Sequence, residues 1–168
     1  PFSSSVYFFT EALIKYGSED IKTQLLPKLV SGEVVGTYGI AEDSHQATEK
    51  NLQVTCSGDK LNGTKIAVPD AGIASHMIVV SKTSQGTELR LVNLSDPSVT
   101  ITSQKNIDTS KAFFKVDFKD TPSDLLGQSG QGWDYIQHLL DQAAVLFAFE
   151  QVGGSQAALD MAKAYSLE

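Results

Sequence analysis

The spacing of the apolar residues changes twice along the chain. Near the start it is the spacing of one helix face. The apolar residues on this face are Phe2, Val6, Phe9 and Leu13. Between about residues 33 and 126, short apolar runs are separated by turn residues, which is typical of strands. From Trp133 to about Ser166 the helical spacing returns, so the pattern predicts helices, then strands, then one long helix.

Two helices are expected before the first strand. Gly17 can end the first helix, and the Ser18 hydroxyl can N-cap the second by accepting a hydrogen bond from its first turn. Pro27 has no N–H group to donate, so we expect it to kink or shorten the second helix. Gly32 ends the helical region. The apolar face of the second helix consists of Ile21, Leu25, Leu26 and Leu29.

Seven short strands are predicted in the middle of the chain. They cover residues 34–41, 51–57, 64–68, 76–82, 88–93, 98–103 and 113–118. Turn sequences such as Asn62-Gly63 separate them, and strands at this spacing favour a sandwich or a small barrel. In the strand at 88–93, Arg90 alternates with apolar neighbours, which predicts that its face lies in solvent.

The predicted fold class is therefore α+β. It consists of a helical pair, an antiparallel β-sandwich or barrel of about seven strands, and one long C-terminal helix. We divide the chain into regions 1–32, 33–127 and 128–168. The apolar positions of the last helix are spread around its circumference, so this helix needs partners on more than one side.

Composition narrows the classes of function. The 168 residues include 20 acidic and 13 basic side chains, for a net charge of −7. This charge repels nucleic acid and anionic lipid, so we expect neither as a partner. No apolar stretch approaches the ~20 residues that a spanning helix needs, so no membrane insertion is expected. Cys56 is the only cysteine, and the three histidines lack zinc-site spacing, which predicts no metal site and suits a cytoplasmic location.

Five sequence segments, in the same order along the chain, resemble those of one known family. Residues 17–33 contain Gly-Ser-Glu, Leu-Pro and Gly-Glu, and residues 39–42 read Gly-Ile-Ala-Glu. Residues 61–65 read Leu-Asn-Gly-Thr-Lys. Residues 116–132 contain Leu-Leu-Gly and two further glycines, and residues 150–165 form the last segment. Together they make the sequence similar to the acyl-CoA dehydrogenases.

The resemblance implies a function. Acyl-CoA dehydrogenases oxidise an acyl-CoA thioester to its 2,3-enoyl form, with α-proton abstraction by a base and hydride transfer to FAD. It therefore implies an acyl-CoA substrate, FAD, homo- or hetero-oligomers, an electron-transferring flavoprotein as electron acceptor, and a place in fatty acid β-oxidation. It also implies that this chain is the middle of a larger enzyme and is inactive alone. The lone Arg90 fits a piece that lacks the segment with the family's cofactor-binding arginine.

Flavin-binding positions follow from the same resemblance. Tyr38, Ile40 and Ala41 match the strand that touches the flavin edge, and Ala67 and Pro69 match two further ring contacts. The family usually has Thr, Trp and Thr at the last three of these positions. Backbone amides can still serve at Ala41 and Ala67, whereas Pro69 has none to donate. The resemblance also places a substrate contact at Ala47, in a loop (residues 43–48) that has lost the family's glycines.

No catalytic base is assigned. The helix position where some family members carry a glutamate corresponds to Ala143, and Glu150 lies two turns beyond it. We interpret Glu150 as a surface residue, His45 as an exposed loop residue and Lys65 as a solvated strand charge.

Two other functions stay open. The first is a non-catalytic subunit or interaction module whose flavin site has decayed, which the residues Ala41, Ala67 and Pro69 favour. The second is a β-sandwich binding domain unrelated to flavin, which the five ordered segments disfavour.

Overall fold

The computed structural model describes residues 1–43 and 45–167; Ser44 of the loop 43–48 and Glu168 at the end of region 128–168 lie outside this part. Two helical segments begin the chain. The first is continuous from η1 (Ser3–Thr10) into α1 (Glu11–Tyr16), and the second is α2 (Glu19–Ser31). These segments confirm the predicted helical pair.

The caps follow the sequence, but the proline does not act as expected. Ser18 caps α2 by accepting a hydrogen bond from the Ile21 N–H at 3.3 Å, and Gly32 ends it in the left-handed conformation. Of the two expected effects of Pro27, the shortening is wrong, because α2 continues past it to Ser31, and the kink stays a prediction. One missing N–H group in the last turns removes only one hydrogen bond, and Leu25 of the same helix is buried.

The first helix buries only part of the predicted apolar face: Phe9 and Leu13 are buried, whereas Phe2 and Val6 are exposed. Its opening segment η1 is a π-helix, in which hydrogen bonds join residues five apart. Each turn therefore holds more residues, and the inward face moves away from the α-helical spacing. Phe8 and Phe9 are buried, whereas Phe2 is 66% exposed.

Eight strands form one sheet. They are β1 (Gly36–Gly39), β2 (Thr55–Ser57), β3 (Lys60–Pro69), β4 (His76–Thr83), β5 (Gly86–Asn93), β6 (Val99–Gln104), β7 (Phe113–Pro122) and β8 (Asp124–Leu126). Their order is β6-β7-β3-β2-β4-β5-β8, and β1 pairs with β4. Most pairs are antiparallel, as predicted, but β1 and β2 run parallel to β4. A short 3₁₀ turn, η2 (Glu49–Asn51), precedes β2.

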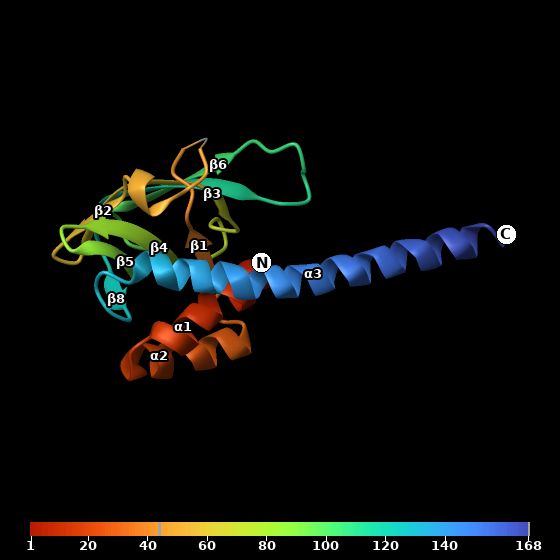
Figure 1. Ribbon diagram of the computed structural model, residues 1–168, viewed down its shortest axis with the longest axis horizontal. Helices are drawn as coiled ribbons and strands as arrows, with labels where there is room; N and C mark the ends of the chain where they lie inside the picture. Colours follow the sequence, from red (N-terminus) through yellow and green to blue (C-terminus); the bar gives the residue numbers. More distant parts are fainter. Residues whose placement is uncertain (44, 168) are drawn as a thin grey trace.

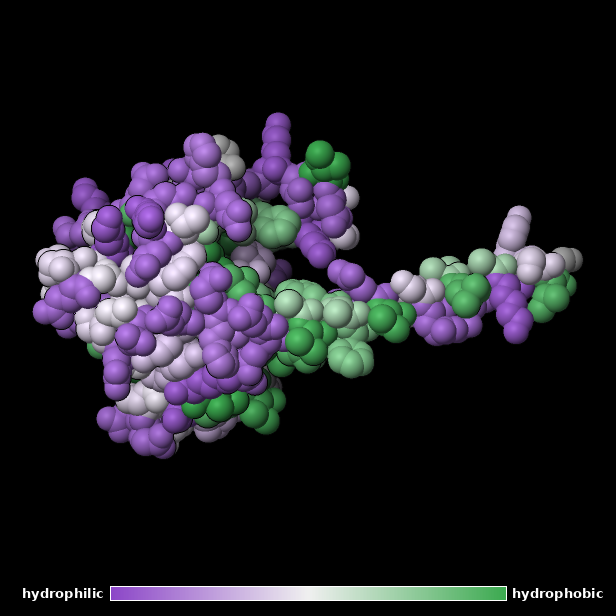
Figure 2. Space-filling view, viewed as in Figure 1, coloured by the Kyte–Doolittle hydropathy of each residue, from purple (hydrophilic) through white to green (hydrophobic). Residues whose placement is uncertain are grey.

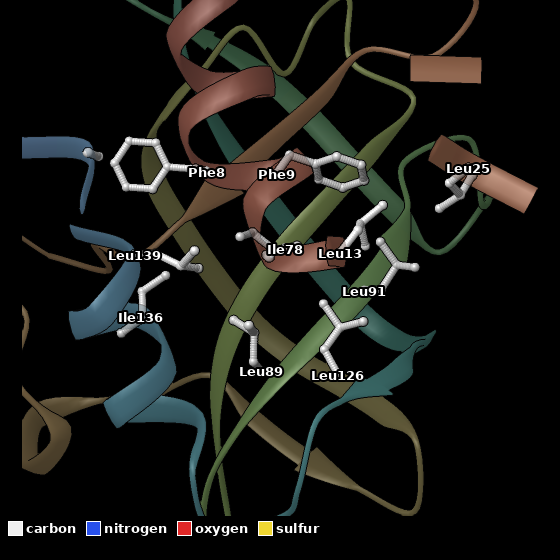
Figure 3. Packing of buried hydrophobic residues seen from close by; sticks show 12 residues of the cluster. Phe8, Phe9, Leu13, Leu25, Ile78, Leu89, Leu91, Leu126, Ile136 and Leu139 are labelled. Atoms are coloured by element: carbon white, nitrogen blue, oxygen red, sulfur yellow. The ribbon is translucent and has the colours of Figure 1, made fainter. Parts of the chain in front are cut away.

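Two apolar clusters cover the two faces of this sheet. Figure 3 shows the first, in which Phe8, Phe9 and Leu13 of the N-terminal helix pack on Ile78 of β4. The second lies among β2, β3, β4, β5 and β7 and includes Met77. Since strand side chains alternate, neighbouring residues of β4 serve different clusters.

Helix α3 (Gly132–Tyr165) is packed at one end only. Its buried residues are Gly132, Ile136, Leu139 and Ala143. Beyond them the helix extends from the rest of the molecule (Figure 1), and apolar side chains cover much of its free part (Figure 2). Among the helices that the structure describes, none is both long and apolar enough to cross a membrane.

Candidate functional site

A hollow of about 420 Å³ lies between the N-terminal helix, the sheet and α3. Two of the predicted flavin contacts, Tyr38 and Pro69, line it together. The other lining residues are Pro1, Phe2, Ser3, Ser4, Asp70, Ser110, Lys111, Ala112, Phe113, Phe147 and Glu150. Residues far apart in sequence therefore meet around the end of β1, where the resemblance places the flavin edge.

Tyr38 is fixed in orientation by an aromatic stack. Its ring lies 3.9 Å from the Phe8 ring, centroid to centroid, at an angle of 22°. Burial raises the pKa of Tyr38 above its ordinary value, and the nearby carboxylate of Asp70 raises it further. The phenol is therefore neutral near pH 7, and the ring offers a rigid wall to the hollow.

The turn after β3 shapes the opposite wall. Asp70 adopts a positive φ of 55°, and its carboxylate accepts a hydrogen bond from Ser4 Oγ at 2.7 Å. The Pro69 carbonyl accepts a hydrogen bond from Thr37 Oγ1 at 2.5 Å. The turn is thus held by both the N-terminal helix and β1.

Ala67 lies beside a neighbouring hollow, together with Gln104 and Phe113. Phe113 lines both hollows. The strand is irregular here, between Lys65 and Val68, and Ala67 has a positive φ of 50°. The N–H group of Ala67 donates to Gln104 Oε1 at 2.8 Å. This amide, expected to serve the flavin, therefore already has a partner within the chain.

Ile40 and Ala41 follow directly after β1 and do not line the first hollow. The Ala41 carbonyl accepts a hydrogen bond from the Ile66 N–H at 2.8 Å, and the Ile40 carbonyl accepts one from Lys65 Nζ at 3.2 Å. Both residues are half-buried. Ala47, the predicted substrate contact, is also half-buried and lies outside the hollow of Tyr38 and Pro69.

The prediction that Lys65 is a solvated charge is wrong. Its side chain is 0% exposed and forms an ion pair with Glu42, whose side chain is 6% exposed. The Nζ–Oε1 distance is 2.6 Å. Burial lowers the pKa of Lys65 to about 8, although Glu42 opposes this shift. Glu42 also accepts hydrogen bonds from the backbone N–H groups of Val54, at 3.1 Å, and Gln53.

Helix α3 brings a carboxylate to the hollow that the motifs did not assign to it. Ala143 is buried in the first cluster at 1% exposure, whereas Phe147 and Glu150 line the hollow. These positions are four and three residues apart, so they share one helix face. That spacing is the signal in the sequence that places Glu150 at the hollow. Glu150 is exposed, as expected. We assign no catalytic base in this chain.

His45 and Cys56, the remaining single residues, contact other residues of the chain. His45 is exposed and donates its N–H to Asp43 Oδ1 at 2.8 Å. Cys56 is buried in β2, and burial raises the pKa of its thiol. Within 1–43 and 45–167, no group of three His, Cys, Asp or Glu side chains lies close enough to hold a metal ion.

The fit of a flavin to these residues is uneven. Tyr38, Pro69 and Phe113 present aromatic and apolar surface to the hollow, which suits the faces of a planar ring. The polar contacts are fewer, because Pro69 has no N–H group and the Ala67 amide is bonded to Gln104. The residues therefore fit the apolar faces of the ring, whereas the Gln104 carboxamide competes for the Ala67 amide, one of the two expected backbone donors.

Known proteins resemble the chain over most of its length. The short-chain specific acyl-CoA dehydrogenase of Sus scrofa mitochondria is 26% identical over 175 residues, covering 95% of this chain and 42% of that enzyme. A probable acyl-CoA dehydrogenase of Bacillus subtilis, YngJ, is 26% identical over 183 residues, covering 99% of this chain and 48% of that protein. No family model matches the chain. The chain thus spans less than half the length of the curated relatives it matches.

A solved structure gives the same result for the fold. A glutaryl-coenzyme A dehydrogenase in complex with glutaryl-CoA superimposes with a TM-score of 0.86 at 24% identity, covering 94% of this chain and 44% of that one. The predicted fold class is confirmed by the observed elements and by this neighbour. The resemblance to acyl-CoA dehydrogenases is confirmed by the curated relatives.

Proposed function

We propose that this chain is part of an acyl-CoA dehydrogenase-like flavoenzyme that oxidises an acyl-CoA thioester to the 2,3-enoyl-CoA. The observation that carries the proposal is the meeting of Tyr38 and Pro69 in one hollow, in a chain similar to these enzymes over nearly its whole length. FAD, when bound, supplies the acceptor for the hydride that leaves the substrate's β-carbon. The base that removes the α-proton is not assigned to a residue of this chain.

The residues of the chain orient and enclose the reactants. Tyr38 and Phe113 supply aromatic walls, and Phe147 of α3 closes the hollow from the helical side. An apolar wall keeps water from the reacting carbons, which favours hydride transfer over side reactions. We propose Tyr38, Ile40, Ala41, Ala67 and Pro69 as flavin contacts and Ala47 as a substrate contact.

FAD is the proposed cofactor. A glutaryl-CoA dehydrogenase of Mycobacterium smegmatis with this fold, 21% identical to the chain, was solved in complex with FADH2. An oligomer, electron transfer to an electron-transferring flavoprotein and a role in fatty acid β-oxidation complete the proposal. The cytoplasm stays our prediction for the compartment, although the curated relative of Sus scrofa is named as mitochondrial.

Flavin absorbance tests the proposal directly. The longest natural polypeptide that contains this sequence is purified, and its visible spectrum is recorded before and after incubation with FAD and desalting. We expect retained flavin absorbance that is bleached when a suitable acyl-CoA is added under anaerobic conditions. We expect residues 1–168 alone to turn over no acyl-CoA.

A second candidate is a non-catalytic subunit with a decayed flavin site. The hydrogen bond from the Ala67 N–H to Gln104 Oε1 favours it, since the chain itself occupies one of the two backbone amides expected to serve the flavin. In this case no FAD is retained, even after co-expression with a partner subunit. That result rejects the first candidate for this polypeptide.

A further inference from the structure

A closed ion pair lies directly beneath the end of β1. Lys65 of β3 and Glu42 bring opposite charges to a 2.6 Å contact, with side chains 0% and 6% exposed. Taking two charges out of water is costly, and an apolar pair of equal volume is often at least as stable. Stability alone therefore does not explain why an ion pair, and not an apolar pair, occupies this position.

The contacts of the pair converge on the segment that follows β1. Lys65 Nζ donates to the Ile40 carbonyl at 3.2 Å. The Glu42 carboxylate, on the same segment, accepts hydrogen bonds from the N–H groups of Val54, at 3.1 Å, and Gln53. The segment is thus joined to β3 on one side and to the approach to β2 on the other.

The stem of Lys65 fixes the same segment by packing. A Cβ atom added to Gly39, the last residue of β1, would lie 3.1 Å from Lys65 Cγ and 2.1 Å from Met77 Cε. Glycine therefore allows the strand to lie directly on the lysine stem. The stem of Lys65 therefore acts on Gly39 and its charge on Ile40, the residue before Ala41.

We propose that Lys65 and Glu42 are positioning residues for the flavin ring, which hold Ile40 and Ala41 in the arrangement that meets the ring edge. The inference rests on the proposed function, because it takes these two residues as flavin contacts. A shift of the strand end by a fraction of an ångström would misplace its carbonyl and amide groups relative to a rigid ring.

Two variants break the pair from opposite sides. Lys65→Met keeps an unbranched stem and removes the charge, whereas Glu42→Gln keeps the shape of the carboxylate and removes its charge. Arg90→Lys is the matched control, because it disturbs the other buried cation of the sheet, which makes no contact with Ile40 or Ala41. All are made in the longest natural polypeptide, and their folding is checked by thermal unfolding.

The readouts are the FAD dissociation constant, measured by flavin fluorescence well below the unfolding temperature, and the absorption spectrum of the bound flavin. We expect Lys65→Met and Glu42→Gln each to weaken FAD binding about tenfold or more and to shift the flavin bands. Arg90→Lys should keep the FAD dissociation constant within twofold of the parent protein and leave the flavin spectrum unchanged. If Lys65→Met fails to fold, Glu42→Gln alone decides.

Two results would overturn the inference. In the first, the parent binds FAD and the pair variants bind it with the same constant and spectrum; the proposed function then stands and only the positioning role fails. In the second, Arg90→Lys weakens binding as much as Lys65→Met, so the effect is general destabilisation. A parent protein that retains no FAD rejects the proposed function and this inference together.

Discussion

Lys65 and Arg90 are both buried cations of the same sheet, but they are held in different ways. Lys65 has one carboxylate partner, Glu42, and both side chains are enclosed. Arg90, with a side chain 3% exposed, pairs with Glu88 at 3.1 Å and with Asp59, which is 77% exposed. The charges around Arg90 reach solvent through Asp59, whereas the Lys65–Glu42 pair is enclosed.

The difference follows from the chemistry of the two cations. The planar guanidinium of Arg90 spreads its donors over several acceptors, and Ser123 receives two of them, at Oγ (3.1 Å) and at its carbonyl (2.8 Å). The compact ammonium of Lys65 concentrates its charge on Glu42 and the Ile40 carbonyl. Arg90 therefore joins β5 to the β2–β3 turn and to the link between β7 and β8, whereas Lys65 contacts one strand end.

The largest expected effect comes from removing the arginine. Arg90→Met leaves the nearly buried Glu88 carboxylate with only the Ser129 hydroxyl as a donor and removes the donor of the Ser123 carbonyl, which should destabilise the protein by about 3–5 kcal/mol. Denaturant unfolding measures the loss. The unfolding free energy of Arg90→Lys should lie between those of the parent protein and Arg90→Met. A loss below about 1 kcal/mol for Arg90→Met would contradict the role of Arg90 in joining these elements.

A smaller loss is expected from Lys65→Met. Glu42 keeps its two backbone N–H donors, and the methionine stem fills most of the lysine volume, so we expect a loss of about 1–3 kcal/mol. Lys115→Met is the control, because Lys115 forms an exposed pair with Asp117 whose loss should change stability by less than about 1 kcal/mol. Equal losses in the two variants would show that burial of the Lys65 pair is without consequence for stability.

The smallest expected effect is a rise of stability with pH that the Lys65 ammonium contributes. Its folded pKa is about 8, below the ordinary value of 10.5. Below about pH 8 both states hold the proton, and between about 8 and 10.5 the unfolded chain binds more protons. The stability should therefore rise with pH in this window, by at most about 1.4 kcal/mol per unit. Unfolding free energies from pH 7 to 9.5 measure the slope, which should be lower in Lys65→Met than in the parent protein.

The sequence predicted the order of the elements because turn residues and apolar spacing are local signals. Strand β8 was missed, since its three residues directly follow β7 and show no alternation. The solvent-facing prediction for Arg90 was wrong for a related reason. Alternation indicates which residues share a face, but Ser123 and Asp59, which cover that face, lie 33 and 31 residues away.

The site residues stay a prediction, although the structure brings two of them together. Tyr38 and Pro69 share a hollow, but no local pattern indicated that Gln104 would reach the Ala67 amide, 37 residues away. Lys65 was misinterpreted because a lysine in a strand is usually solvated, and its partner Glu42 is 23 residues away. Long-range polar pairs depend on how the strands are ordered in space, which apolar spacing does not specify.

Strand β4 has a consequence for how the sheet assembles. Met77 belongs to one apolar cluster and Ile78 to the other, and the strand pairs with β1, β2 and β5. A register slip of one residue would exchange the side chains of both clusters at once and displace three neighbouring strands. A sheet with β4 out of register would thus pack neither apolar cluster correctly. The pairing of β4 should behave as an all-or-none step during folding, so that misaligned intermediates gain little and reopen.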